Sequence, residues 1–147
     1  MIVGFFTPVN GYTNILELPM QTKKNKKVLV VDDDNDTRAL ICMMLEVHGY
    51  VPLSYSSARE AREAIKTEIV GSALLDVMMP ETNGYEFLEE LRADPRNSKI
   101  PVIMLTAKDS DDDMLTGYKL GADYYIPKPF SSEQLQYGLQ LVLEAQH

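Results

Sequence analysis

Polar residues that could do chemistry stand directly after four short apolar segments of this chain. Asp32 and Asp33 follow VLVV, Asp76 follows ALL, Thr106 follows VIML, and Lys128 comes just after DYYI. Carboxylates gathered in one pocket repel each other and raise each other's pKa unless a cation joins them. Oxygen ligands without a nearby cluster of histidine or cysteine favour a hard cation. These residues therefore predict a site for Mg²⁺, with Mn²⁺ as the alternative.

The same residue types suit phosphoryl transfer. A carboxylate such as that of Asp76 can act as a nucleophile and form an aspartyl phosphate. The charge that develops on the transferring group then needs a metal, a fixed cation and hydrogen-bond donors. Lys128 would supply the cation, and Thr106 with a backbone amide near Ala107 would supply the donors. The pattern predicts that Asp76 is phosphorylated.

Apolar segments alternate with segments of helical periodicity, and this order would bring the distant site residues together. Strands that alternate with helices form parallel βαβ units, with helices covering both faces of the sheet. Ligands of such sheets bind beyond the carboxyl ends of the strands. We predict an α/β fold of (βα)5 order, a doubly wound parallel five-stranded sheet. The predicted strands are 28–31, 51–54, 73–75, 102–105 and 123–126, and the predicted helices are 36–48, 58–67, 84–92, 111–120 and 132–144.

Composition and charge narrow the class of protein. The 147 residues are 45% apolar, and the single cysteine, Cys42, cannot form an internal disulfide. No apolar stretch is long enough to cross a bilayer, and the first residues lack the basic start of a signal peptide. Residues 1–27 carry a net charge of +3 within a total of −8, so the rest is strongly acidic. We expect a cytoplasmic protein with neither nucleic acid nor a membrane as its partner.

The chain divides unevenly. Residues 1–26 show no strong period, and the basic run KKNKK (Lys23–Lys27) spans their end. They are predicted to be an N-terminal extension and linker, and Met20 is an alternative start. Residues 27–147 are predicted to form one domain. After the last predicted helix no output domain is expected, which favours a domain that acts alone.

Four segments carry a resemblance to a known family. VLVVDDD, LLDVMMPETNGYEFLEELR, PVIMLTAK and GADYYIPKPF resemble the signature segments of receiver domains in bacterial two-component response regulators, over residues 27 to about 145. The resemblance implies a flavodoxin-like receiver fold in a stand-alone protein similar to the chemotaxis regulators. It makes Asp76 the phospho-acceptor and Asp32 and Asp33 the acid pair, with Asp33 the direct metal ligand. Met78 would give a backbone carbonyl to the metal.

The resemblance also implies a mechanism and partners. Thr106 and Lys128 would contact the phosphoryl oxygens, and Thr106 with Tyr125 would form the conformational switch, while the Lys128–Pro129 bond would be cis. The phosphoryl donor would be a histidine kinase or a histidine phosphotransfer protein, and the target an unknown downstream protein. Such a domain catalyses only its own phosphorylation and dephosphorylation. Asn35 departs from the family pattern, because proline is frequent there.

Competing interpretations remain for several of these residues. A haloacid-dehalogenase-like phosphatase also forms an aspartyl phosphate, and Asp33, Asn35 and Thr37 approach its D-x-D-x-T motif, although its second aspartate is Asn35 here. An interaction module without phosphorylation is a third possibility. Asp34 and Asp36 are explained by the positive end of a helix dipole, as is the run 109–113. Neighbouring strand residues point to opposite faces, so Tyr125 can be the switch while Tyr124 packs.

The first predicted helix carries more apolar residues than one buried stripe requires. Ala39–Leu45 reads ALICMML, seven apolar residues in a row, whereas a helix that lies on a sheet buries only one face. We expect the excess to dock a helix of the histidine-bearing donor. The alternative is that Ile15, Leu16 and Leu18 of the extension cover it.

Overall fold

The computed structural model describes residues 26–107 and 111–145, in which strands and helices alternate as predicted. The order (βα)5 is thereby confirmed. Predicted and observed boundaries differ mostly by one or two residues. The elements are β1 (Lys27–Val31), α2 (Asn35–Val47), β2 (Val51–Tyr55), α3 (Ala58–Ala64), β3 (Ser72–Asp76), α4 (Gly84–Ala93), β4 (Val102–Thr106), α5 (Asp111–Leu120), β5 (Tyr124–Pro127) and α6 (Ser132–Glu144).

The five strands form one parallel sheet in the order β2-β1-β3-β4-β5. The chain runs outward from β1 to β2 and then crosses back to β3, so the direction of winding changes between β1 and β3. Ligands of open α/β sheets bind at such a switch point. Val31 is paired with Leu75 there, and the residues that follow them, Asp32 and Asp76, therefore leave the sheet as neighbours.

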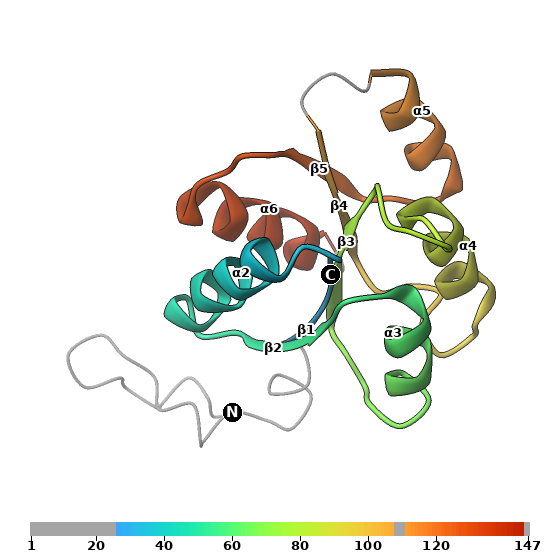
Figure 1. Cartoon of the computed structure of the whole chain (residues 1–147), viewed down its shortest axis with the longest axis horizontal. Coiled ribbons are helices and arrows are strands. Elements are labelled where there is room, and N and C mark those ends of the chain that lie inside the picture. Colours follow the sequence, from blue (N-terminus) through green and yellow to red (C-terminus); the bar gives the residue numbers. More distant parts are fainter. Residues whose placement is uncertain (1–25, 108–110, 146–147) are drawn as a thin grey trace.

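Helices cover the sheet on both sides (Figure 1), with α2 and α6 on one face and α3, α4 and α5 on the other. Alternate strand residues point to opposite faces, so Val28 and Val30 pack toward α2 and α6 while Leu29 and Val31 pack toward the other three helices. β1, β3 and β4 are almost completely buried, whereas the edge strand β2 is half exposed. The central strands thus bury both faces, as their continuous apolar runs predict.

The helix ends follow local sequence signals. The side chain of Asp34 accepts a hydrogen bond from the Thr37 amide and caps α2, which confirms the helix-end explanation of Asp34. Ser131 and Gln134 form a capping box at the start of α6. Gly49 and Gly121 have φ angles of +86° and +111°, so both end a helical segment in the left-handed region that favours glycine.

One helix is shorter than predicted. α3 was expected to reach residue 67 but ends at Ala64, where the amides of Lys66 and Thr67 bond to carbonyls three residues back and the chain tightens into a turn. The buried Ile65 holds this turn against the core. Among the helices that the structure describes, none has the length and apolar character needed to cross a membrane.

Candidate functional site

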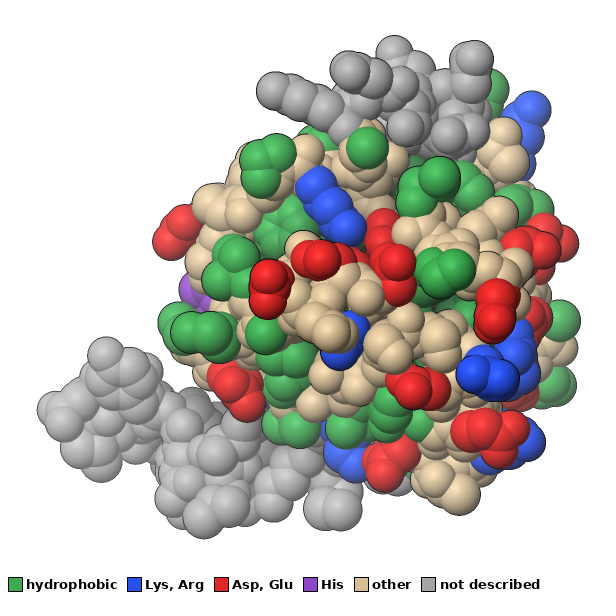
Figure 2. Space-filling model, viewed as in Figure 1, with side chains coloured by type: hydrophobic (Ala, Val, Ile, Leu, Met, Phe, Trp, Pro, Cys, Tyr) green, Lys and Arg blue, Asp and Glu red, His purple; other side chains and the backbone are tan. Residues whose placement is uncertain are grey.

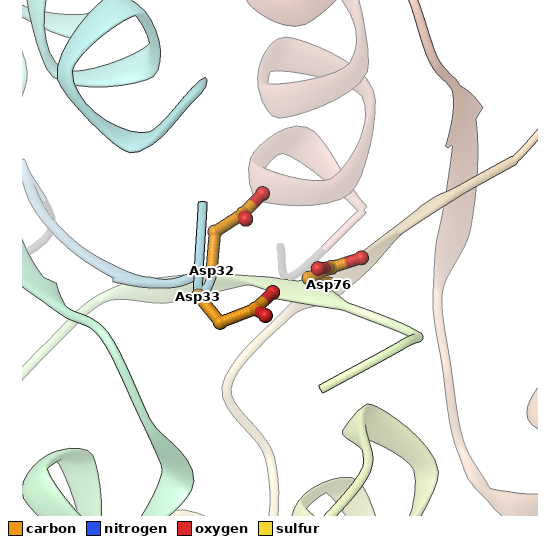
Figure 3. Close-up of side chains that lie close together, drawn as sticks. All are labelled: Asp32, Asp33 and Asp76. Atoms are coloured by element: carbon orange, nitrogen blue, oxygen red, sulfur yellow. The ribbon is translucent and has the colours of Figure 1, made fainter. Parts of the chain in front are cut away.

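Three carboxylates meet at the carboxyl ends of β1 and β3. One oxygen from each of Asp32, Asp33 and Asp76 lies within 4.8 Å of the other two. Figure 3 shows the Asp33 and Asp76 carboxylates side by side, with Asp32 next to them. Asp32 is fully buried and Asp76 is 6% exposed, whereas Asp33 is open to solvent. The predicted acid pair and the predicted phospho-acceptor therefore share one pocket that solvent reaches from the Asp33 side.

Lys128 faces this cluster from the loop after β5. Its Nζ lies 2.9 Å from Asp32 Oδ2 and 3.3 Å from Asp76 Oδ1, and its backbone amide donates to the Thr106 carbonyl at 2.7 Å. The Lys128–Pro129 peptide bond is cis, as the family resemblance implies. The predicted cation thus bridges two of the three carboxylates and is tied to the end of β4.

The charged groups of the pocket shift one another's pKa values. Burial, together with the neighbouring charge of Asp32, raises the pKa of Asp76 from 3.8 to about 6, although Lys128 and the Met78 amide oppose this shift. Burial by itself would lower the pKa of Lys128, but the hydrogen bond to Asp32 and the charge of Asp76 outweigh burial and raise it. Lys128 is therefore firmly cationic, while Asp76 lacks full compensation for its negative charge.

The remaining unbalanced charge suits a divalent cation. Carboxylate oxygens from three residues, with no sulfur or imidazole ligand in the cluster, are the donor set that Mg²⁺ and Mn²⁺ prefer. Mg²⁺ usually takes one or two protein carboxylates and keeps its other positions for water and phosphate oxygens. The donor set and the open side at Asp33 fit such an ion.

Asp32 is held through both its backbone and its side chain. Oδ1 accepts a hydrogen bond from the Asp34 amide at 2.9 Å, and the backbone carbonyl accepts one from Arg38 Nη1 at 2.7 Å. Its amide donates to the Tyr55 carbonyl at 3.2 Å and extends the β1–β2 pairing. The role of Arg38 was not predicted, because its six-residue separation from Asp32 gives no local sequence signal.

Gly84 brings α4 against the phospho-acceptor strand. A Cβ atom at this position would lie 2.2 Å from the Asp76 carbonyl oxygen, and the Gly84 amide donates to the Val77 carbonyl at 3.0 Å. Any side chain here would therefore displace either α4 or the backbone of Asp76. The sequence indicated only that a helix begins at Gly84, and the close approach required the tertiary structure.

Thr106 and Met78 lie beside the pocket. Thr106 ends β4, is 3% exposed, and its Oγ1 donates to the Ala107 carbonyl at 3.1 Å. The Met78 amide donates to Asp76 Oδ1 at 3.3 Å, and Met78 is 73% exposed. Phosphoryl contact by Thr106 and metal ligation by the Met78 carbonyl stay predictions.

Tyr125 lies inside the fold, on the face covered by α4 and α5. It is 5% exposed, its hydroxyl donates to the Tyr85 hydroxyl at 3.1 Å, and its ring meets the Tyr118 ring edge-on at 4.8 Å. A Cβ on Gly117 would lie only 1.4 Å from the Tyr125 hydroxyl oxygen, so this glycine makes the space for the buried ring. Tyr124 packs on the opposite face, which agrees with the predicted alternation.

His48 and Cys42 have plain structural positions away from the acidic cluster. His48 Nε2 and Ser132 Oγ are 2.7 Å apart, a bond that joins the end of α2 to the start of α6. Cys42 is a free, half-buried cysteine on α2. The described residues do not include the apolar residues of the extension, Met20, His147 or the start of the acidic run 109–113.

The D-x-D-x-T interpretation does not match the contacts around α2. Thr37 donates its hydroxyl to the Asp34 carboxylate, and the Asn35 side-chain oxygen accepts from Arg38 Nη2 at 2.7 Å. Both residues are therefore engaged in holding the start of the helix.

Comparisons with known proteins agree with this geometry. Residues 28–140 match the family described as the response regulator receiver domain. The chain is 40% identical over 118 residues to the phosphate regulon transcriptional regulatory protein PhoB of Pseudomonas aeruginosa, a match that covers 80% of this chain and 52% of that protein. The chain spans about half the length of the curated relatives it matches. The comparisons give no support to a haloacid-dehalogenase-like phosphatase.

Solved structures show the same fold. The chemotaxis protein CheY4 of Vibrio cholerae superposes with a TM-score of 0.77 at 32% identity, over 80% of this chain and 98% of that one. The receiver domain of sensor histidine kinase PA1611 from Pseudomonas aeruginosa superposes with a TM-score of 0.74 at 27% identity, over 82% of this chain and 98% of that one. The PA1611 structure has a magnesium ion coordinated in its active site cleft.

Proposed function

This chain belongs to the response regulator receiver domain family, and we propose that it accepts a phosphoryl group from a phosphohistidine onto Asp76. A receiver domain is a signalling switch of two-component systems. The observation that carries the proposal is the convergence of three carboxylates within 4.8 Å of one another with the Lys128 ammonium facing them. A site of this kind holds a nucleophile, a cation and room for a metal in one pocket.

In the proposed transfer, an Asp76 oxygen attacks the phosphorus of the phosphohistidine. The P–N bond breaks as the P–O bond forms, and its electron pair returns to the ring nitrogen. Because the other ring nitrogen of the phosphohistidine already carries a proton, the histidine leaves as neutral imidazole. Lys128, 3.3 Å from Asp76 Oδ1, would move to the phosphoryl oxygens as negative charge accumulates there. In the later hydrolysis, water attacks the phosphorus, the Asp76–phosphorus bond breaks, and inorganic phosphate leaves.

Asp33 is the proposed direct ligand of Mg²⁺, with Asp32, Asp76 and the Met78 carbonyl completing the protein's contribution. Support comes from the donor set of the cluster and from the magnesium ion in the PA1611 relative. When bound, Mg²⁺ would offset the charge of the carboxylates and of the transferring phosphoryl group. Mn²⁺ would fit the same ligands.

Thr106 and Tyr125 are the proposed switch. Moving a two-state equilibrium from 1:99 to 99:1 takes about 5.5 kcal/mol. Charge-assisted hydrogen bonds contribute about 1.5–3 kcal/mol each, so new contacts of the phosphoryl group with Thr106, Lys128 and an amide near Ala107 would suffice. The inward Tyr125 ring, which lies between α4 and α5, would report the change to a downstream protein.

The donor is proposed to dock on apolar residues of α2. Leu40, Met43 and Val47 are 52%, 63% and 78% exposed, and their spacing of three and four residues forms one stripe along the helix. Figure 2 shows hydrophobic side chains at the surface of the side that α2 and α6 form. A helix of a histidine kinase or phosphotransfer protein would fit such a stripe. The same stripe could instead be covered by residues 1–19.

Two changes to the chain test whether the phosphoryl donor or residues 1–19 cover the apolar stripe of α2. Met43→Glu should slow phosphoryl transfer from a phosphorylated histidine phosphotransfer domain, whereas Ile69→Glu, at a similarly exposed position of 59%, should not. Deleting residues 1–19 should leave the rate unchanged if the stripe is open to the donor. Faster transfer after the deletion would instead support masking by the extension.

The remaining assignments extend the same proposal. Residues 1–26 are an extension and basic linker, and residues 27–147 are the receiver domain, in a cytoplasmic protein. That nucleic acid is not a partner stays a prediction, because PhoB is by name a transcriptional regulatory protein.

Labelling with acetyl phosphate and Mg²⁺ tests the proposal directly. Intact mass should show one added phosphoryl group on the wild-type chain and none on Asp76→Asn. Asp123→Asn is a matched control, because this aspartate lies at the opposite end of β5 and bonds to Arg92 and the Val102 amide. Equal labelling of wild type and Asp76→Asn would exclude Asp76, and turnover of a phosphomonoester substrate would revive the phosphatase alternative.

A further inference from the structure

Arg38 connects the first turn of α2 to the loop that carries the acid pair. Its Nη1 donates to the backbone carbonyl of Asp32 at 2.7 Å, and its Nη2 donates to the Asn35 side-chain oxygen at 2.7 Å. The Arg38 amide also donates to the Asp34 carbonyl at 2.9 Å. Arg38, a half-buried residue, thus contacts both ends of the loop between β1 and α2.

The carbonyl that Arg38 holds belongs to the peptide unit between Asp32 and Asp33. A peptide unit is planar, so fixing the direction of its carbonyl also fixes the direction of the Asp33 amide. On the other side of Asp33, the Asp34 amide donates to Asp32 Oδ1 at 2.9 Å. Both peptide units that flank Asp33 are therefore tied to a neighbouring group.

The orientation of the Asp33 carboxylate depends on this backbone more than the orientations of the Asp32 and Asp76 carboxylates do. The Asp32 and Asp76 carboxylates each have Lys128 as a direct partner. Within residues 26–107 and 111–145, no hydrogen bond or ion pair holds the Asp33 carboxylate. Its side chain lies toward Asp76 (Figure 3), so the backbone that places its Cα–Cβ bond is the part of its support that the described contacts identify.

We propose that Arg38 is a positioning residue that holds Asp33 in the orientation needed to bind a divalent cation. This inference rests on the metal site proposed above. Residues that orient metal ligands typically change metal affinity about 10–100-fold when they are mutated. We expect Arg38→Gln to weaken Mg²⁺ binding about 10-fold.

The positive charge of Arg38 should weaken Mg²⁺ binding, whereas its positioning of Asp33 should strengthen it. The sign of the change in affinity therefore distinguishes the two effects. A guanidinium near a cation site repels the cation, so removing its charge should tighten Mg²⁺ binding if charge were its only role. Positioning predicts weaker binding, so the two explanations differ in sign and not only in size.

Two further variants, Arg38→Lys and Asn35→Ala, separate the charge of Arg38 from its individual hydrogen bonds. Lysine keeps the positive charge but lacks the planar fork that reaches two acceptors at once, so Arg38→Lys should also weaken binding. Asn35→Ala removes only the Nη2 acceptor and leaves the contact with the Asp32 carbonyl, so its effect should be smaller than that of Arg38→Gln.

The experiment is a calorimetric titration of the full chain with MgCl₂, without a phosphoryl donor. Arg59→Gln is the matched control, because Arg59 is an exposed arginine on α3 and its loss removes the same charge. Weaker binding in Arg38→Gln than in Arg59→Gln supports positioning. Binding equal to or tighter than that of Arg59→Gln overturns it.

Hydrogen exchange in EDTA tests the positioning role of Arg38 in the metal-free protein. The Asp34 amide should exchange faster in Arg38→Gln than in wild type, because the loop that presents it to Asp32 Oδ1 is loosened. Unchanged exchange would contradict the inference even if the variant bound Mg²⁺ more weakly. Urea unfolding in the same buffer shows whether the variant is folded.

Asp33→Asn separates failure of this inference from failure of the metal site. If Asp33→Asn binds Mg²⁺ as tightly as wild type, the proposed site is wrong and Arg38 has nothing to position. If Asp33→Asn loses binding while Arg38→Gln keeps it, the site stands and the role of Arg38 falls.

Discussion

The acidic pocket and the tyrosine cluster are held in different ways. In the pocket, Asp32, Asp76 and Lys128 are joined by two ion pairs, and Asp32 makes further bonds to the backbone of its own loop. In the tyrosine cluster, the Tyr125 hydroxyl donates to the Tyr85 hydroxyl, and the Tyr125 ring packs over Gly117 and edge-on against Tyr118. Ion pairs join the side chains of the pocket, whereas aromatic rings and hydroxyls meet in the tyrosine cluster.

This difference fits a switch that senses at one place and reports at another. Charged groups held at fixed positions need little rearrangement when a phosphoryl group arrives. A neutral hydrogen bond such as that between Tyr125 and Tyr85 can be exchanged for a few kcal/mol, which is the scale that a phosphoryl group can supply. The comparison predicts large effects of changes in the pocket and smaller ones in the tyrosine cluster.

Lys128→Met should have the largest effect. It leaves the fully buried Asp32 carboxylate without its cation, and breaking a buried ion pair costs about 3–5 kcal/mol, less here because Lys128 is partly exposed. Labelling by acetyl phosphate should slow about 100-fold, since one stabilising group of the transition state is lost. Urea unfolding and intact mass measure the two effects.

Lys66→Met is the control for this change. Lys66 pairs with Glu63 on the surface, and exposed pairs contribute about 0–1 kcal/mol. A loss of stability as small in Lys128→Met as in Lys66→Met would mean that charge does not hold the pocket.

Stability of the metal-free protein should depend on pH through Asp76. Its pKa is raised from 3.8 to about 6 in the folded state, so the folded protein binds this proton more tightly than the unfolded chain does. Stability is therefore lost as pH rises from about 4 to about 6, by up to about 3 kcal/mol. Asp76→Asn cannot titrate and should remove this loss.

Urea unfolding in EDTA at pH 4.5 and pH 7 measures the effect. The stability of Asp76→Asn relative to wild type should be greater at pH 7 than at pH 4.5. An equal difference at the two pH values would show that Asp76 is not strained by its burial beside Asp32.

Gly117→Ala should disturb the tyrosine cluster without reaching the pocket. The new Cβ would overlap the Tyr125 hydroxyl, so the ring must move outward, at about 1–3 kcal/mol for an overpacked site. Mg²⁺ affinity should stay unchanged while Tyr125 becomes more exposed, which tyrosine fluorescence quenching and ring signals in NMR spectra would detect.

Gly138→Ala is the matched control on α6. Its new Cβ would lie 3.1–3.2 Å from Ile126 and Tyr124 side chains, a contact that small shifts relieve. If Gly117→Ala left Tyr125 as buried as Gly138→Ala does, packing over Gly117 would not be what holds the ring.

Tyr85→Phe should have the smallest effect. It removes the hydroxyl that accepts from Tyr125 at 3.1 Å and keeps the ring, so the expected loss is about 0.5–1.5 kcal/mol. Labelling at Asp76 should proceed at the wild-type rate, whereas release of Tyr125 should become easier. A loss as large as that of Lys128→Met would erase the proposed difference between the two regions.

Most of the fold could be predicted because its signals are local. Continuous apolar runs indicated the buried strands, and segments of helical periodicity indicated the helices between them. α3 was predicted too long, because the turn after Ala64 depends on hydrogen bonds that helical periodicity does not reveal.

The site could be predicted only as a set of residue types. Asp32, Asp33, Asp76 and Lys128 stand at predicted strand ends, and the parallel sheet brings strand ends together. The contacts of Arg38 and Gly84 join positions that are separated in the sequence or lie on different elements. No local pattern signals such contacts.

The sequence by itself determined the order of the elements and the chemistry available at the strand ends, because residue type and periodicity act over short stretches of chain. Only the tertiary structure decided the pairing of Val31 with Leu75, which makes Asp32 and Asp76 neighbours. It also decided that Asp32 is buried while Asp33 is exposed. Strand pairing and burial arise from contacts between distant segments, and those contacts exist only once the chain has folded.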